Sequence, residues 1–128
     1  MIHGFYRKNN FNFFPIVKIK VYSGDDDHHH HDFDALVDTG SDISYLDKKN
    51  SLKLVSTSMR TVKSITNDEK TLPLYNVRII LDARKISLPI ICSDLSGKVY
   101  DALLGWDVLQ YFDISMRMNK FLRIKSLK

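Results

Sequence analysis

The short segment Asp38-Thr39-Gly40 holds the residues best suited to chemistry in this chain. It follows a run, 33–37, in which alternate side chains are apolar, the period of a half-buried strand. A carboxylate at the end of a rigid strand is held in place, and Gly40 lets the chain turn where a Cβ would crowd it. Such a carboxylate can take up or release a proton during a reaction. Asp38 is therefore the first candidate for a catalytic residue.

The elements that would position Asp38 are short strands. Many short strands with one brief helix predict an all-β, barrel-like domain. A polar turn at 66–70 would join two strands as a hairpin, Asp47–Leu54 predicts a turn or a helical turn, and Trp106–Phe112 predicts one or two helical turns. The alternating runs that predict strands are 17–21, 33–37, 43–46, 59–65, 71–82, 86–92, 100–104, 114–118 and 121–124.

The bulk composition is that of one ordinary globular domain, and we expect a single domain over 1–128. The chain has 128 residues, of which 44% are hydrophobic. The formal net charge is only +4, and no stripe of basic and aromatic residues stands out, so we expect no nucleic-acid partner. Cys92 is the single cysteine and lies in an apolar run, which favours a buried thiol. No signal peptide or membrane-spanning segment is visible, so we expect no membrane partner and a cytoplasmic location.

An acidic and histidine-rich tract, Asp25–Asp32, separates two predicted strands. His28–His31 could bind Ni²⁺ or Zn²⁺ adventitiously, but a dedicated metal site needs fixed geometry. We expect an exposed loop here and no metal site.

A second motif, Ala102-Leu103-Leu104-Gly105, follows the hairpin and precedes the predicted helix. With Asp38-Thr39-Gly40 before it, this order resembles the retropepsin-like aspartic peptidases, the family of retroviral proteases and their single-domain cellular relatives. The resemblance covers about residues 15–125, the expected core of the domain. It implies a closed β-barrel lobe with a flap hairpin and one short C-terminal helix.

The resemblance also implies a role for each matched residue. Asp38 matches the catalytic aspartate, and Thr39 matches the threonine that links two active-site loops across a dimer axis. Gly40, Leu104 and Gly105 are expected to support the active site. Expected contacts to a polypeptide substrate come from the floor of the site and from the flap, namely Ser41, Asp42, Ile65 and Thr66.

Peptide hydrolysis by this chemistry needs two carboxyl groups, one to deprotonate a water and one to protonate the carbonyl oxygen. Two carboxyls a few Å apart do not both ionise readily, so the pair shares one proton. The chain has one Asp-Thr/Ser-Gly motif, since Asp94-Leu95-Ser96-Gly97 carries an extra residue. We therefore expect a homodimer that forms its dyad from two copies of Asp38, without a cofactor.

Two departures from the family pattern favour an alternative. The flap candidate 64–70 contains no glycine, and Trp106 stands where retroviral enzymes usually carry arginine. The alternative is a catalytically weak or inactive peptide-binding or dimerisation module. We expect Trp106 to be a packing residue and leave open whether Asp42 caps a turn, pairs with a cation or contacts substrate. Phosphoryl transfer at Asp32-Phe33-Asp34 is disfavoured, because that chemistry calls for Mg²⁺ and a parallel α/β sheet.

Overall fold

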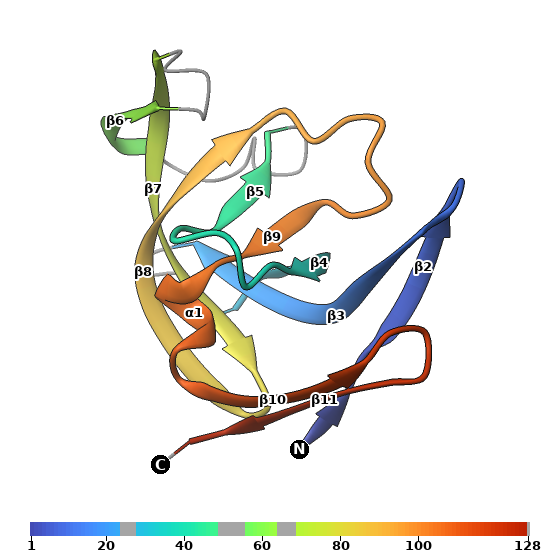
Figure 1. The fold of residues 1–128 in the computed structure, drawn as a ribbon. Helices are drawn as coiled ribbons and strands as arrows, with labels where there is room; N and C mark the ends of the chain where they lie inside the picture. The colour runs from blue at the N-terminus through green and yellow to red at the C-terminus, as the bar shows by residue number, and fades with distance from the viewer. Residues whose placement is uncertain (24–27, 49–55, 64–68, 128) are drawn as a thin grey trace.

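The computed structural model of the protein describes residues 1–23, 28–48, 56–63 and 69–127. Within these ranges the chain forms eleven strands and one helical turn (Figure 1). In chain order they are β1 (Ile2–His3), β2 (Phe5–Asn9), β3 (Asn12–Ser23), β4 (His30–Val37), β5 (Tyr45–Asp47), β6 (Ser56–Lys63), β7 (Glu69–Leu81), β8 (Arg84–Ser93), β9 (Ala102–Leu104), α1 (Trp106–Leu109), β10 (Phe112–Arg117) and β11 (Phe121–Ser126).

The larger sheet closes on itself, as the resemblance predicted. Its strands run in the order β2-β3-β4-β9-β5-β8-β7-β6, and β3 also pairs with β7. This extra pairing makes a ring of β3, β4, β9, β5, β8 and β7, while β2 and β6 lie outside it. Closure removes the open edges of the ring, so the predicted all-β barrel lobe is confirmed.

Alternating side chains of the ring strands fill its interior. Each large aliphatic side chain buried in this way contributes about 1.5–3 kcal/mol to stability. Cys92 is buried among them, as the sequence predicted. The inward residues of the three longest ring strands and β4 include Val17, Ile19, Val21, Phe33, Ala35, Val37, Val77, Ile79, Leu81, Ile86, Ile90 and Cys92.

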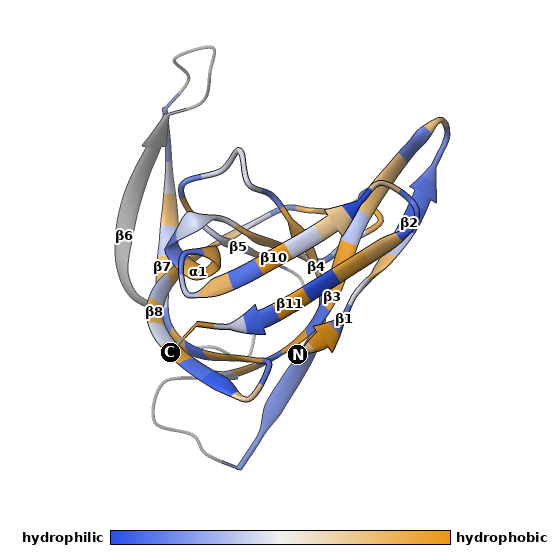
Figure 2. Ribbon diagram, turned by 60° about the horizontal axis from the view of Figure 1, so that its bottom comes forward, coloured by the Kyte–Doolittle hydropathy of each residue, from blue (hydrophilic) through white to orange (hydrophobic). Residues whose placement is uncertain are grey.

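The two ends of the chain build a second, smaller sheet in the order β1-β11-β10. Beyond β1, the amide of Gly4 donates to the carbonyl of Leu122 at 2.9 Å, so the N-terminal segment continues along β11. Figure 2 shows hydrophobic and hydrophilic residues alternating along β10 and β11. Leu122 and Ile124 of β11 point into the core, and this sheet therefore covers one side of the barrel.

The sequence-based boundaries need several corrections. β1 and β2 were not predicted, because Phe5–Asn9 has no simple alternation and is a strand through its pairing with β3. The helix ends at Leu109, since Phe112 already pairs with Ser126 in the small sheet. The strands expected over 43–46 and 100–104 are three residues each, Tyr45–Asp47 and Ala102–Leu104. Of the turn expected over 47–54, Asp47 belongs to β5 and residues 49–54 lie outside the described residues. Of the hairpin tip expected over 66–70, Glu69 and Lys70 belong to β7 because they pair with Lys63 and Val62, and residues 66–68 lie outside the described residues.

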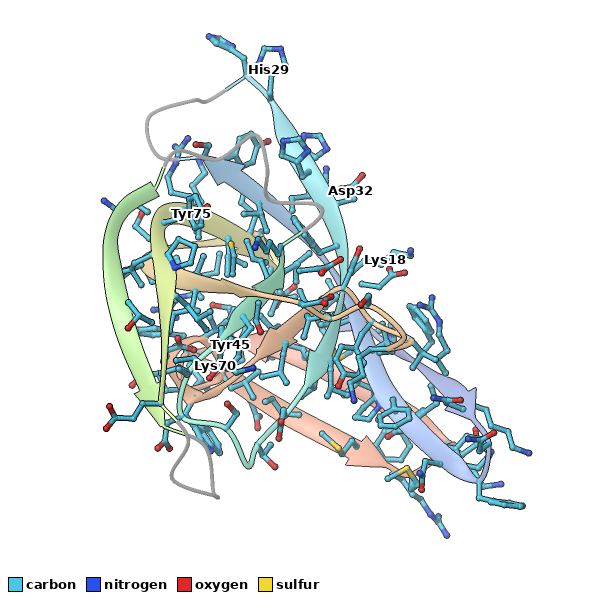
Figure 3. The ribbon with its side chains drawn as sticks, turned by 90° about the horizontal axis from the view of Figure 1, so that it is seen from above. Lys18, His29, Asp32, Tyr45, Lys70 and Tyr75 are labelled. Carbon is cyan, nitrogen blue, oxygen red and sulfur yellow. The ribbon has the colours of Figure 1, made fainter. Side chains whose placement is uncertain are left out.

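The loop prediction for Asp25–Asp32 is wrong for its last three residues, since His30, His31 and Asp32 belong to β4. They pair with Tyr22, Val21 and Lys20, because β3 extends to Ser23 and provides partners for them. The rings of Tyr22 and His30 lie 5.5 Å apart between centroids. In Figure 3, His29 lies at the far outer end of β4. The histidines are thus at the opposite end of this strand from Asp38.

Candidate active site

Asp38 directly follows β4, and its backbone is held by the neighbouring parallel strand. The Asp38 amide donates to the carbonyl of Leu104 at 3.0 Å, continuing the pairing of Val37 with Leu104. Carboxyl ends of parallel strands meet at one edge of a sheet. The two sequence motifs therefore meet at that edge, with Leu104 supporting the backbone of Asp38.

The turn after β4 fixes the carboxylate itself. Oδ1 of Asp38 accepts a hydrogen bond from the Gly40 amide at 3.0 Å, and the Asp38 carbonyl accepts one from the Ser41 amide at 3.2 Å. A Cβ on Gly40 would lie 3.3 Å from Oδ1 of Asp38. Glycine at this position therefore leaves room for the carboxylate. The half-buried carboxylate lies beside exposed Thr39 and Gly40.

Hydrogen bonds from the first backbone amides of α1 hold this loop, and Gly105 packs closely against it. The amide of Trp106 donates to the carbonyl of Ser41 at 2.9 Å, and that of Asp107 donates to the carbonyl of Asp42 at 3.2 Å. A Cβ on Gly105 would lie 2.5 Å from the carbonyl oxygen of Ile43, closer than real Cβ contacts. The site therefore has room only for glycine at position 105, which explains the glycine of the second motif.

Ser44 and Asp107 form a buried link that the sequence analysis missed. The Ser44 hydroxyl donates to Oδ1 of Asp107, and the Ser44 amide donates to Oδ2 at 2.9 Å. The same hydroxyl oxygen accepts from the Gly105 amide at 2.9 Å. An acidic residue in the first helical turn and a serine between two short apolar segments were the available signals. This link ties the start of β5 to α1 and keeps both motifs in one rigid unit.

Trp106 contacts the active-site turn directly and is not a buried packing residue. Its indole Nε1 donates to the carbonyl of Thr39 at 2.6 Å, while 45% of the residue stays exposed. The ring is therefore not part of the buried core, and its indole anchors the turn. The indole holds the residue next to Asp38, a position that the sequence analysis had assigned no anchor.

Of the four predicted substrate-contacting residues, the structure describes Ser41 and Asp42. The Ser41 hydroxyl donates to the carbonyl of Ile43 at 2.7 Å and stays half-buried. The Asp42 side chain is exposed beside it, on the same turn as Asp38. Ile65 and Thr66 lie outside the described residues. Ser41 and Asp42 are thus brought close to Asp38, and both stay candidates for substrate contact.

Tyr100 is a further residue near Asp38 that sequence reasoning overlooked. Burial raises the pKa of the Tyr100 phenol, and the negative charge of Asp38 raises it further. The Tyr100 ring packs against Phe14 of β3, with 6.0 Å between centroids. The aromatic side chain before Ala102 was the available signal. Tyr100 thus forms part of the surroundings of the carboxylate.

An ionic cluster holds the segment that carries Tyr100. Arg7 donates to the carbonyl of Val99 at 2.6 Å and to Oδ2 of Asp34 at 3.1 Å. Oδ1 of Asp101 accepts from the Asp34 amide at 2.6 Å, and Lys18 donates to Oδ1 of Asp34 at 2.9 Å. Partial burial raises the pKa of Asp34, but its hydrogen bonds to Lys18 and Arg7 lower that pKa overall. For Asp101, partial burial raises the pKa.

Among the described residues, no group of three or more His, Cys, Asp or Glu side chains is placed to hold a metal ion. No helix within those residues has the length and apolar character needed to cross a membrane.

The ring closed by β3 and β7, with Asp38 and Gly105 at one edge, defines a retropepsin-like fold. Solved structures with the same fold include the protease of simian foamy virus, 14% identical over 75% of this chain and 92% of that one, with a TM-score of 0.55. The EIAV protease in complex with the inhibitor HBY-793 is 18% identical over 81% of this chain and 92% of that one, with a TM-score of 0.58.

A bacterial neighbour extends the similarity to nearly the whole chain. The retropepsin-like aspartic protease of Rickettsia conorii is 13% identical, covers 98% of this chain and 91% of that one, and has a TM-score of 0.55. No family model matches the sequence, and no curated protein is detectably similar to it. At these identities the comparisons establish the retropepsin-like fold.

Proposed function

We propose that the protein is an aspartic endopeptidase that hydrolyses peptide bonds as a homodimer. The observation that carries the proposal is the position of Asp38. Its backbone is fixed by Leu104, one carboxylate oxygen is held by the Gly40 amide, and the turn around it is exposed. A rigid carboxylate at an exposed turn is half of the two-carboxyl arrangement that this hydrolysis requires.

The second carboxyl comes from a second copy of the chain. Asp34 and Asp101 are engaged in the cluster around Arg7, and Asp107 is bonded to Ser44. A two-fold axis through the active-site turn brings two copies of Asp38 together, with Thr39 of each copy beside the axis. One carboxyl of the pair is protonated and the other ionised, because two adjacent carboxylates repel each other.

In this arrangement the ionised carboxylate takes a proton from a water molecule, which attacks the peptide carbonyl carbon. The protonated carboxyl gives its proton to the carbonyl oxygen. The substrate lies extended beneath the β6–β7 hairpin, in contact with Ser41, Asp42, Ile65 and Thr66. Tyr100, held near Asp38 by the cluster at its base, contributes to the wall of the same site.

Peptide profiling tests the proposal. Purified protein is incubated with a library of proteome-derived peptides between pH 3 and 7, and the products are identified by mass spectrometry. We expect cleavage by the wild type and a loss of about 10²–10⁴-fold in rate for Asp38→Asn. Asp94→Asn is the matched control, since Asp94 is an exposed carboxylate that accepts a hydrogen bond from the Ser96 amide, as Asp38 does from the Gly40 amide.

Equal cleavage by the wild type and Asp38→Asn would refute the proposal. Saturable peptide binding without products, even after long incubation at high protein concentration, would favour the alternative of a peptide-binding or dimerisation module. The Trp106 contact to Thr39 argues against that alternative, because the turn that carries Asp38 is anchored in spite of the missing arginine.

A further inference from the structure

β10 is an open edge of the small sheet. Within the part of the chain that the structure describes, β11 lies between β1 and β10, so β10 has a partner on one side only. The amide of Leu127 donates to the carbonyl of Tyr111, which sets the phase of the antiparallel ladder. In such a ladder, alternate residues direct their backbone groups to opposite sides. The backbone groups of Phe112, Ile114 and Met116 therefore point away from β11.

The two faces of β10 have different characters. On the side of the barrel, Phe112 is buried and Ile114 is half-buried, but Met116 and the next methionine, Met118, are 38% and 59% exposed. The outer face carries Asp113 and Arg117, both exposed. Unpaired edge strands with exposed apolar side chains readily add another strand.

We infer that β10 pairs antiparallel with β10 of a second copy, around a two-fold axis at Ser115. This register places Ile114 opposite Met116 of the other copy, and each such pair exchanges both backbone hydrogen bonds. It also places Asp113 opposite Arg117 of the other copy, once on each side of the axis. Opposite charges on directly facing residues stabilise a strand pair. The sequence of β10 is thus complementary to itself.

The neighbouring register lacks this complementarity. With the axis at Ile114, Asp113 would face Ser115 of the other copy, and Arg117 would face Tyr111. The other edge of the small sheet, β1, is two residues long and is pinned by the N-terminal ammonium group, which lies 2.8 Å from Oδ1 of Asp82. β10 is therefore the better edge for a second copy.

The inference rests on the proposed function and specifies how its homodimer forms. α1 separates β10 from the turn that carries Asp38, and the first amides of α1 bond to that turn. In Figure 3, the segment between β4 and β5 and the β10–β11 hairpin lie on the same lower side of the barrel. In a dimer built on β10, the active-site turns of both copies are therefore directed toward the two-fold axis.

Charge exchange across the axis tests the inference. Asp113→Arg gives a chain with two positive residues at the facing positions, and Arg117→Asp gives a chain with two negative ones. Each variant alone should bind itself about ten-fold or more weakly than the wild type, because both facing pairs become repulsive. An equimolar mixture should restore the dimer, because every facing pair is again of opposite charge. Sedimentation at pH 6–7 and low salt measures these affinities, and circular dichroism checks folding.

The control is Lys85→Asp, an equal change of charge at an exposed position on β8. The double variant Asp113→Arg/Arg117→Asp should dimerise like the wild type. Dimerisation that is insensitive to the single variants, or a mixture no tighter than either variant alone, would overturn the inference, as would a wild type that stays monomeric. A dimer that responds to the charge changes as expected but cleaves no peptide would refute the proposed function and support the inference. A dimer that cleaves peptides but whose affinity does not depend on these charges would refute the inference and support the proposed function.

Discussion

Gly105→Ala is the most direct test of the way the two motifs are joined. The added Cβ would lie 2.5 Å from the carbonyl oxygen of Ile43 and 2.7 Å from that of Ser41. An ordinary carbon-to-oxygen contact is about 3.3 Å or longer. Both clashing atoms belong to the backbone, so no side-chain rotation relieves the overlap. The backbone of Gly105 itself has φ −98° and ψ −169°, which any residue adopts, so the effect is steric.

The magnitude follows from the contacts that must shift. Overpacking against a rigid backbone costs about 1–3 kcal/mol. Displacing Gly105 also weakens its hydrogen bond to Ser44, which contributes about 0.5–1.5 kcal/mol. We expect the free energy of unfolding to fall by about 1.5–4.5 kcal/mol. For a domain of this size that corresponds to a fall in Tm of about 10 °C.

Urea unfolding at one fixed protein concentration measures the change, since association shifts apparent stability. Trp106 is the single tryptophan and lies next to the substituted residue, so its fluorescence follows unfolding near the site. Gly97→Ala is the control: its φ is +81° and no atom lies within 4 Å of the added Cβ. It should cost about 1 kcal/mol through backbone strain alone. A loss for Gly105→Ala no larger than that of Gly97→Ala would refute the steric argument.

Two further predictions concern the surroundings of the turn. Trp106→Phe removes the hydrogen-bond donor to the Thr39 carbonyl but keeps an aromatic ring. The free energy of unfolding, measured by urea unfolding followed by circular dichroism, should fall by about 0.5–1.5 kcal/mol, and kcat should show a larger relative loss. An unchanged free energy of unfolding together with an unchanged kcat would contradict this prediction. Burial raises the pKa of Asp101 above its ordinary value of 3.8. Below that value the protonated group contributes fully to the stability of the fold. This contribution is lost as pH rises through the pKa of the folded state. Asp101→Asn stays neutral and should become more stable relative to the wild type between pH 3 and 7; a difference that does not vary with pH would contradict this reasoning.

Period-two alternation was enough to predict most of the barrel. Each of its strands buries one face, so the alternation of apolar residues around Ile19, Phe33 and Ile79 predicts a strand from the sequence alone. β2 lacked this signal, because its first three residues are all half-buried and its last two exposed, so its burial does not alternate; its register comes from pairing with β3. Local sequence does not encode such pairing, nor the closure of β3 onto β7.

The candidate site was predictable at its motifs and not at its supports. Asp38 and Gly105 stood out because few residue types satisfy their positions. Ser44, Asp107 and Arg7 act through partners that are distant in sequence, at separations of 63 residues for Ser44 and Asp107 and 92 for Arg7 and Val99. A single polar residue in an ordinary segment gives no sign of such a partner.

One strand, β7, belongs both to the wall of the barrel and to the hairpin that it forms with β6. Its later residues pair with β3 and β8, and its earlier ones with β6. A slip of one residue along the wall would turn Val77, Ile79 and Leu81 out to solvent. The barrel therefore fixes where the β6–β7 hairpin begins, because these three buried side chains hold the register of β7 along the wall.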